Sequence, residues 1–318
     1  MKVLVAGASG VVGRQLVPVL RETGHDVFTL RRAMSSAGGP PAGNEANVVV
    51  ADALDRSALS AAVRGCAPDV VVNLLTAIPE RLNPRQFERQ MARTNQLRTE
   101  GTANLIAAAR GARLISEGLA YAYAPVGGPV ADEDRPLWTS GPKPFRPSAR
   151  ALLELERLTA ETGGVVLRLG HLHGPGTMFA PDGSYTEQVR AGKVPIVGDG
   201  TGRFSFIHTY DAATAIIAAV DKPEVTGALN VVDDEPAEVR HWLPMFARVA
   251  GGPAPRRVPA PIARLAVGSW GVAYMNGLAG ADNRRARQRL DWRPRYGGVE
   301  LGFPAEFAGS QASPSAAG

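Results

Sequence analysis

A glycine-rich turn near the beginning of the sequence constrains the fold more than any other feature. The turn, Gly7–Gly13 (Gly-Ala-Ser-Gly-Val-Val-Gly), follows the apolar segment Val3–Ala6 and leads into a segment with helical periodicity. Gly7 permits a tight turn, Gly10 lets the backbone approach a ligand, and Gly13 allows the helix to pack on the strand. The free N–H groups of a helix N-terminus attract phosphate. The turn therefore predicts a pyrophosphate site of a dinucleotide, built from Gly7, Ser9, Gly10, Val11, Val12 and Gly13.

Short apolar segments and helical segments alternate through the first half of the chain. The apolar segments are typical of buried parallel strands and comprise Val3–Ala6, Val27–Leu30, Val48–Val50, Val70–Leu74, Leu114–Ile115 and Val165–Leu169. The predicted helices between them are Val11–Glu22, Ser57–Arg64, Pro84–Arg110 and Ser148–Thr162. Because parallel strands need crossover helices, we predict an α/β fold with a doubly wound (Rossmann) parallel sheet.

The regular alternation ends after Leu169. A Gly- and Pro-rich region, 170–202, precedes a predicted helix at Asp211–Val220 and a strand at Ala228–Val232. We predict a dinucleotide-binding domain over 1–169 and a smaller, interleaved C-terminal substrate lobe over 170–308, with some segments returning to the core. The tail, 309–318, is rich in Ser, Ala and Gly and is expected to be disordered. Open α/β sheets bind ligands beyond the carboxyl ends of their strands, where this lobe begins.

Composition narrows the class of protein. A hydrophobic content of 45% and a charged content of 20% indicate a globular chain. The net charge of +5 comes from basic residues spread along the sequence without aromatic interleaving, so we expect no nucleic-acid partner. The single Cys66 and the absence of a recognisable export signal predict a cytoplasmic protein without disulfides. We expect a small-molecule substrate and no membrane partner, and a homodimer is possible.

Further motifs follow the glycine turn in a recognisable order. They are Asp52–Leu54, Val71–Ala77, Gly101–Leu105, Leu167–Gly170, Gly174–Gly176, Gly198–Gly200, Phe206–His208, Asp211–Ala213 and Asn230–Pro236. Together with the Gly-x-x-Gly-x-x-Gly spacing, this order resembles the extended short-chain dehydrogenase/reductase superfamily, also called the NAD-dependent epimerase/dehydratase family. The resemblance implies that Asp52 and Ala53 contact adenine. It also implies that the cofactor passes over Leu74, Leu75 and Thr76.

The residues that follow the second predicted strand indicate which cofactor is used. NAD-binding units place an acidic residue there to accept hydrogen bonds from the ribose hydroxyls. This chain has Arg31 and Arg32 instead, and Asp26 lies at the opposite end of the strand. Guanidinium groups bind phosphate through paired hydrogen bonds. We therefore predict NADP as the cofactor in preference to NAD, although an arginine that stacks on adenine would serve either one.

The catalytic Tyr-x-x-x-Lys pair of the family is missing. Its two positions fall on Arg146 and Arg150, and the neighbouring Phe145 cannot transfer a proton. Arg150 is expected to hold ribose hydroxyls, but an arginine remains protonated and does not replace the tyrosine as a proton donor. The resemblance is thus to an atypical member of the family.

Another residue in the same crevice has to supply any proton that the reaction needs. Tyr123 is our first candidate, with Tyr121 beside it, and Ser116 lies near the serine of the family. His171 and His173 follow the sixth predicted strand, and histidine is a competent acid near neutral pH. No Cys pair or His-Glu helix motif accompanies these histidines, so no metal is predicted.

Three functions are compatible with these observations. The leading hypothesis is an NADP-dependent oxidoreductase that transfers a hydride between nicotinamide and a small organic carbonyl, alcohol or sugar-derived substrate. A sugar-type epimerase or dehydratase with a bound cofactor is the second, and a non-catalytic protein that binds NAD(P) is the third. The fold alone does not separate them.

Overall fold

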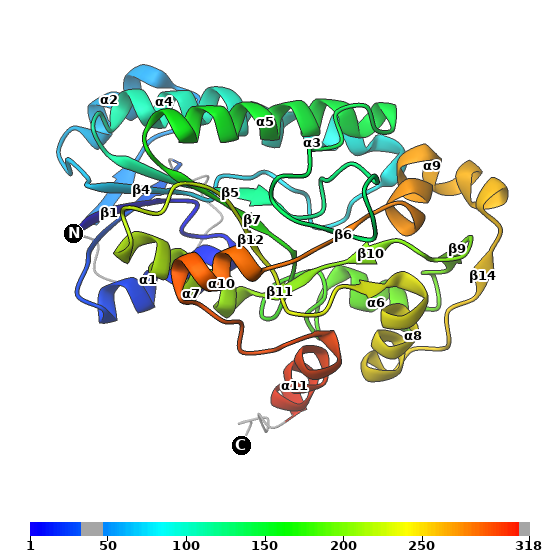
Figure 1. Cartoon of the computed structure of the whole chain (residues 1–318). Coiled ribbons are helices and arrows are strands. Elements are labelled where there is room, and N and C mark those ends of the chain that lie inside the picture. Colours follow the sequence, from blue (N-terminus) through cyan, green and yellow to red (C-terminus); the bar gives the residue numbers. More distant parts are fainter. Residues whose placement is uncertain (33–46, 312–318) are drawn as a thin grey trace.

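A computed structural model describes residues 1–32 and 47–311 of the chain. Its centre is a seven-stranded parallel sheet of order β12-β7-β5-β4-β1-β2-β3 (Figure 1). The strands are β1 (Lys2–Ala6), β2 (Asp26–Arg31), β3 (Val48–Val50), β4 (Val70–Asn73), β5 (Arg113–Leu119), β7 (Val165–Leu169) and β12 (Gly227–Val231). The predicted doubly wound α/β fold is confirmed. The Pro and Gly residues over 38–43 predict a loop after β2, and these positions lie outside the described residues.

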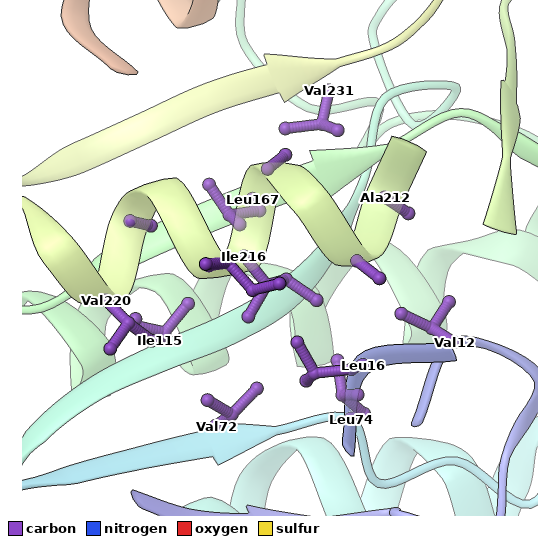
Figure 2. Close-up of a cluster of buried hydrophobic side chains, with 14 of the residues drawn as sticks. Val12, Leu16, Val72, Leu74, Ile115, Leu167, Ala212, Ile216, Val220 and Val231 are labelled. Carbon is purple, nitrogen blue, oxygen red and sulfur yellow. The ribbon is translucent and has the colours of Figure 1, made fainter. Parts of the chain in front are cut away.

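Helices cover both faces of this sheet, as Figure 1 shows. One face carries α2 (Arg56–Val63), α4 (Thr102–Ala108) and α5 (Arg146–Glu161); the other carries α1 (Val11–Glu22) and α7 (Thr209–Asp221). Figure 2 shows the apolar core on the second face, where α7 lies against the sheet beside α1. Burial of this core is the main force that holds the two helices on the sheet.

Strand register brings the glycine turn to the edge at which ligands bind. Ala6 of β1 lies opposite Leu30 of β2 and Asn73 of β4. Gly7 and Leu74, which follow β1 and β4, and Arg31, which ends β2, therefore lie along one edge of the sheet. β12 pairs with β7, so the chain returns to the central sheet well after residue 170.

The long predicted helix over Pro84–Arg110 is divided into four pieces. It consists of a 3₁₀ turn at Pro84–Gln86, α3 (Phe87–Gln96), a π-helical turn at Leu97–Gly101, and α4. A π-helical turn inserts one extra residue into the helical ladder and often marks a functional site. The periodicity of the sequence does not reveal this insertion, because apolar residues keep nearly the same spacing across it.

The smaller lobe consists of short elements around an aromatic core that includes Phe204, Phe206 and Trp242. Its helices are α6 (Ser184–Arg190), α8 (Val239–Ala250), α9 (Ala260–Asn276) and α11 (Val299–Gln311). Its strands, with β6 from the first half, are β6 (Val130–Ala131), β8 (His171–His173), β9 (Ile196–Val197), β10 (Arg203–Phe204), β11 (Phe206–His208), β13 (Ala237–Glu238), β14 (Arg257–Val258) and β15 (Gly280–Ala281). Helix α10 (Arg284–Leu290) instead packs against β12 of the central sheet and against α7.

The C-terminal end corrects one expectation. Helix α11 continues to Gln311, so residues 309–311 are helical and not part of a disordered tail, and residues 312–318 lie outside the described chain. No helix within the described residues is long and apolar enough to cross a membrane.

Candidate active site

The glycine turn forms a cradle of free backbone amides. Gly7 has a φ of +96°, and a Cβ there would lie 2.6 Å from the carbonyl oxygen of Leu74. A Cβ on Gly13 would lie 2.4 Å from the carbonyl oxygen of Gly7, so both positions exclude side chains. Ser9 and Gly10 are exposed, and Gly10 begins α1 without a side-chain cap. The first amides of α1 are therefore free for an anion such as a pyrophosphate.

The residues predicted to bind the adenosine end of the cofactor lie beside this cradle and carry positive charge. Arg31 ends β2 half-buried, its Nε is buried without a hydrogen-bond partner in the described chain, and Arg32 is exposed. Asp52 accepts hydrogen bonds from the Leu54 amide at 2.9 Å and from Arg93 Nη2 at 3.0 Å. Ala53 is buried next to Asp52.

The segment after β4 closes the other side of the cradle. Leu74 packs on the glycine turn, Leu75 donates its amide to Asn73 Oδ1 at 3.3 Å, and Thr76 is exposed. The glycine turn, the unpartnered Arg31 Nε and this open segment fit a nicotinamide dinucleotide that lies along one edge of the sheet.

Tyr123 is a structural residue in this molecule, which corrects its assignment as proton donor. Its ring is 1% exposed, and its hydroxyl donates to Asn230 Oδ1 at 2.5 Å and accepts from Arg168 Nη1 at 2.8 Å. Burial raises the pKa of Tyr123 to about 12. A hydroxyl that is enclosed and bonded on both sides is not available to a substrate.

Ser116 is also enclosed within the fold. Its Oγ is buried and lies 2.8 Å from Thr159 Oγ1 of α5, so the pair joins the helix to the sheet. Arg150 is exposed on α5, one turn after Arg146, whose Nε donates to the carbonyl oxygen of Gly141 at 2.7 Å. The arginines that replace the tyrosine and lysine of the family are thus accessible, whereas Ser116 is not.

His171 lies between two aromatic rings and is not protonated near neutral pH. Its ring centroid is 4.1 Å from that of Tyr121 and 4.2 Å from that of Phe204, both stacked. Burial lowers the pKa of His171 to about 3, and its Nδ1 lies 3.1 Å from the carbonyl oxygen of Ser205. His171 therefore packs as a neutral ring and is a poor general acid, contrary to our expectation. Across the described residues, no three His, Cys, Asp or Glu side chains converge as a metal site.

The structure gathers three polar side chains at the end of β5, of which sequence reasoning proposed only Tyr121. Arg98 comes from the π-helical turn and Glu117 from β5 itself. Their charges interact with each other and with Tyr121. Burial raises the pKa of Glu117 to about 7, and the Arg98 charge opposes that rise. The sequence could have indicated Glu117, because a carboxylate is unusual within a buried strand. It gives no such indication for Arg98, which resembles any charged residue of a surface helix.

Glu117 connects this group to the cofactor cradle. A packing gap too small to hold a water molecule lies between the ends of β4, β5 and β7. It is lined by Leu74, Ile115, Ser116, Glu117, Leu167, Leu169 and Ile216. Leu74 contacts the glycine turn on its other side, so Glu117 lies one side chain away from the predicted cofactor path.

The sheet, the glycine cradle and the interleaved lobe define a Rossmann-type enzyme of the extended short-chain dehydrogenase/reductase class, which uses a nicotinamide cofactor. Residues 3–232 match the family described as the NAD dependent epimerase/dehydratase family. The chain belongs to this family, and it is an oxidoreductase of that type.

Similar proteins extend this result. A Streptomyces protein named 3-diazoavenalumate denitrifying reductase is 47% identical over 302 residues, which cover 93% of this chain and 97% of that relative. The UDP-glucose 4-epimerase of Thermotoga maritima, solved with UDP-glucose, has a TM-score of 0.73 at 20% identity over 98% of this chain and 99% of its own. The human epimerase family protein SDR39U1, solved with NADPH, has a TM-score of 0.71 at 20% identity, over 97% of this chain and 99% of its own. The similarity to these two solved structures shows the fold alone.

Proposed function

We propose that this protein is an NADPH-dependent reductase that replaces the diazo group of an aromatic acid with hydrogen and releases N₂. The single observation that carries the proposal is an open cofactor cradle beside a site without the tyrosine–lysine pair. The 47% identical relative named as a reductase of a diazo compound supports the substrate class. The aromatic side chains that surround His171, among them Tyr121, Phe204 and Tyr274, favour a planar ring as the substrate.

The proposed reaction explains why a proton-transfer pair is dispensable. A carbonyl that accepts a hydride becomes an alkoxide and needs a proton from a nearby acid. An aryl diazonium group reacts as Ar–N₂⁺ + H⁻ → Ar–H + N₂, so the leaving group departs as a neutral gas and no oxyanion forms. The reduced nicotinamide, when bound, supplies the hydride. The protein then has to hold the ring in place and exclude water.

The choice of NADPH follows from the end of β2. Arg31 and Arg32 offer guanidinium donors where a carboxylate would favour NAD, and Arg31 Nε is buried without a partner among residues 1–32 and 47–311. Arg150, exposed on α5, is proposed to donate to the nicotinamide ribose hydroxyls.

Turnover with a defined diazo acid tests the proposal. The substrate is 3-amino-4-hydroxycinnamic acid diazotised with nitrous acid, and the cofactor is NADPH carrying deuterium at C4. We expect NADPH oxidation, N₂ release and 4-hydroxycinnamate formation in equal amounts, with the deuterium on the ring carbon that lost nitrogen.

A panel of aldehydes, ketones and nucleotide sugars serves as the control. Reduction of a carbonyl compound while the diazo acid remains unreacted would contradict the proposal and favour an ordinary carbonyl reductase. Conversion of a nucleotide sugar without net NADPH consumption would indicate an epimerase instead.

A further inference from the structure

Arg98 is a buried cation without a close anionic partner among the described residues. Its side chain is 3% exposed, and it forms no hydrogen bond and no ion pair within 4.0 Å in the part of the chain that the structure describes. Buried charges in proteins are almost always paired, because an isolated charge away from water is strongly unfavourable. An unpaired buried arginine beside a cofactor path therefore indicates a missing anionic partner.

The nearest carboxyl group that acts on Arg98, that of Glu117, does not fill the place of that partner. Glu117 interacts with Arg98 electrostatically but does not approach within 4.0 Å, and its carboxyl group accepts no hydrogen bond within the described ranges. Glu117 is only partly buried, as is Tyr121. The π-helical turn at Leu97–Gly101 places the guanidinium at this point of the helix.

Three tyrosine hydroxyls continue the same polar track. Tyr121, Tyr185 and Tyr274 are half-buried, and none of these hydroxyls has a hydrogen-bond partner among residues 1–32 and 47–311. Tyr274 interacts electrostatically with both other tyrosines, and its ring centroid is 4.8 Å from that of Phe204. These half-buried hydroxyls are therefore open to water or to the polar groups of an aromatic ligand.

We propose that Arg98 is the anion-binding residue of the substrate pocket, where it binds the charged oxygen of a planar aromatic acid lying against Tyr121 and Tyr274. The inference rests on the proposed function in that it places the substrate beside the cofactor, and it names the residue that selects an acid. The charged oxygen belongs either to the carboxylate or to an ionised ring hydroxyl, and both are anionic oxygens that a guanidinium binds.

Binding of 4-hydroxycinnamate to the protein saturated with NADP⁺ tests this inference by calorimetry. We expect Arg98→Met to weaken the affinity by about thirtyfold, because a charge-assisted hydrogen bond is lost, and Arg98→Lys to restore part of it. NADPH affinity is expected to change less than about threefold. The matched control is Arg89→Met, which removes an exposed arginine of α3 bonded only to Gln86 and leaves acid binding unchanged.

Two analogues distinguish the source of the charge. If the carboxylate binds Arg98, the methyl ester of 4-hydroxycinnamate binds weakly and is insensitive to Arg98→Met. If the ring oxygen binds Arg98, the ester retains sensitivity and unsubstituted cinnamate binds weakly. Equal affinity of all three compounds for the wild-type and Arg98→Met proteins would overturn the inference.

Thermal unfolding separates this role from a structural one. Removal of an unpaired buried charge should leave the melting temperature unchanged or raise it, whereas loss of a structural arginine would lower it. A lower melting temperature with unchanged acid affinity would therefore refute the role of Arg98 in binding the acid. Diazo turnover with an unaffected KM in Arg98→Met would refute the role of Arg98 and leave the proposed function standing. Acid binding that depends on Arg98, without diazo turnover, would refute the proposed function and leave the role of Arg98 standing.

Discussion

The ionisation of single residues at the end of β5 is governed by burial. Glu117 is held neutral up to about pH 7, His171 is neutral down to about pH 3, and Arg98 has no paired anion in the part of the chain that the structure describes. His171 was expected to titrate near neutral pH, and the low polarity around its ring removes that behaviour. The chemistry of the site therefore depends on where the fold places these groups.

Glu117 should make acid binding depend on pH. Below about pH 7 its carboxyl is protonated and leaves the Arg98 charge free, whereas above that pH its carboxylate competes with the bound acid. Tyr121, the other titratable group in this cluster, has its pKa raised to about 12 by burial and stays neutral. We expect the Kd of 4-hydroxycinnamate to rise by about threefold to tenfold between pH 6 and pH 8, measured by calorimetry. The Glu117→Gln variant should show no such rise, and a wild-type profile in that variant would contradict the assignment.

Tyr123 should matter for stability and not for turnover. Tyr123→Phe leaves Asn230 Oδ1 and Arg168 Nη1 without their shared partner, at a loss of about 1–3 kcal/mol in the free energy of unfolding. Urea unfolding measures that loss, and steady-state kinetics should give kcat within about threefold of wild type. A kcat loss of about a hundredfold or more, with stability retained, would restore Tyr123 as a proton donor.

At the scale of elements, the shape of the glycine turn depends on close contact between its backbone and the first residues of α1. Gly13→Ala introduces a Cβ that would lie 2.4 Å from the carbonyl oxygen of Gly7, so α1 has to move away from the turn. We expect NADPH affinity to fall by about tenfold or more, measured by fluorescence titration. The control, Gly65→Ala, places its Cβ where nothing lies within 4 Å, and it should bind NADPH normally.

The end of β2 should set the cofactor preference. Replacement of Arg31 and Arg32 by serine removes the guanidinium donors, so NADPH affinity should fall by about tenfold or more while NADH affinity changes less than about threefold. Calorimetric titration of both cofactors provides the measurement, with exposed Arg21→Ser at the end of α1 as the control. Equal losses for NADPH and NADH would mean that the arginines stack on adenine.

Elements of strong periodicity were predicted well and irregular ones were not. The strands β1, β2, β3, β4 and β7 lie where their apolar segments indicated, because buried parallel strands leave a continuous apolar signal. The break of the segment over Pro84–Arg110 at Leu97–Gly101 was missed, and with it the position of Arg98. The turn packs against α5, and a contact with that distant helix is not visible in local periodicity.

At the scale of the molecule, the dinucleotide-binding unit includes segments from the second half of the chain. Helix α7 covers the sheet beside α1, and β12 pairs with β7 along its edge (Figures 1 and 2). Residues such as Leu16 and Leu167 are buried only because α7 and its neighbours cover them.

A fragment of residues 1–169 should therefore fail to fold cooperatively. Without α7 and β12 it exposes one apolar face of the sheet and the unpaired edge of β7, and it loses a large part of the core burial that stabilises the unit. Circular dichroism during heating should show a broad transition for the fragment and a sharp one for the full chain. A sharp transition for the fragment would show that 1–169 is an independent domain.

The sequence by itself determined the alternating strands and helices, the cradle for a dinucleotide and the loss of the tyrosine–lysine pair, because these depend on local periodicity, glycine spacing and residue identity. Only the tertiary structure decided that Tyr123 and Ser116 are enclosed, that His171 is neutral and that Arg98, Glu117 and Tyr121 share one site. Burial and proximity arise from contacts between distant segments. The charge state and accessibility of a side chain follow from those contacts and cannot be assigned from its neighbours in sequence.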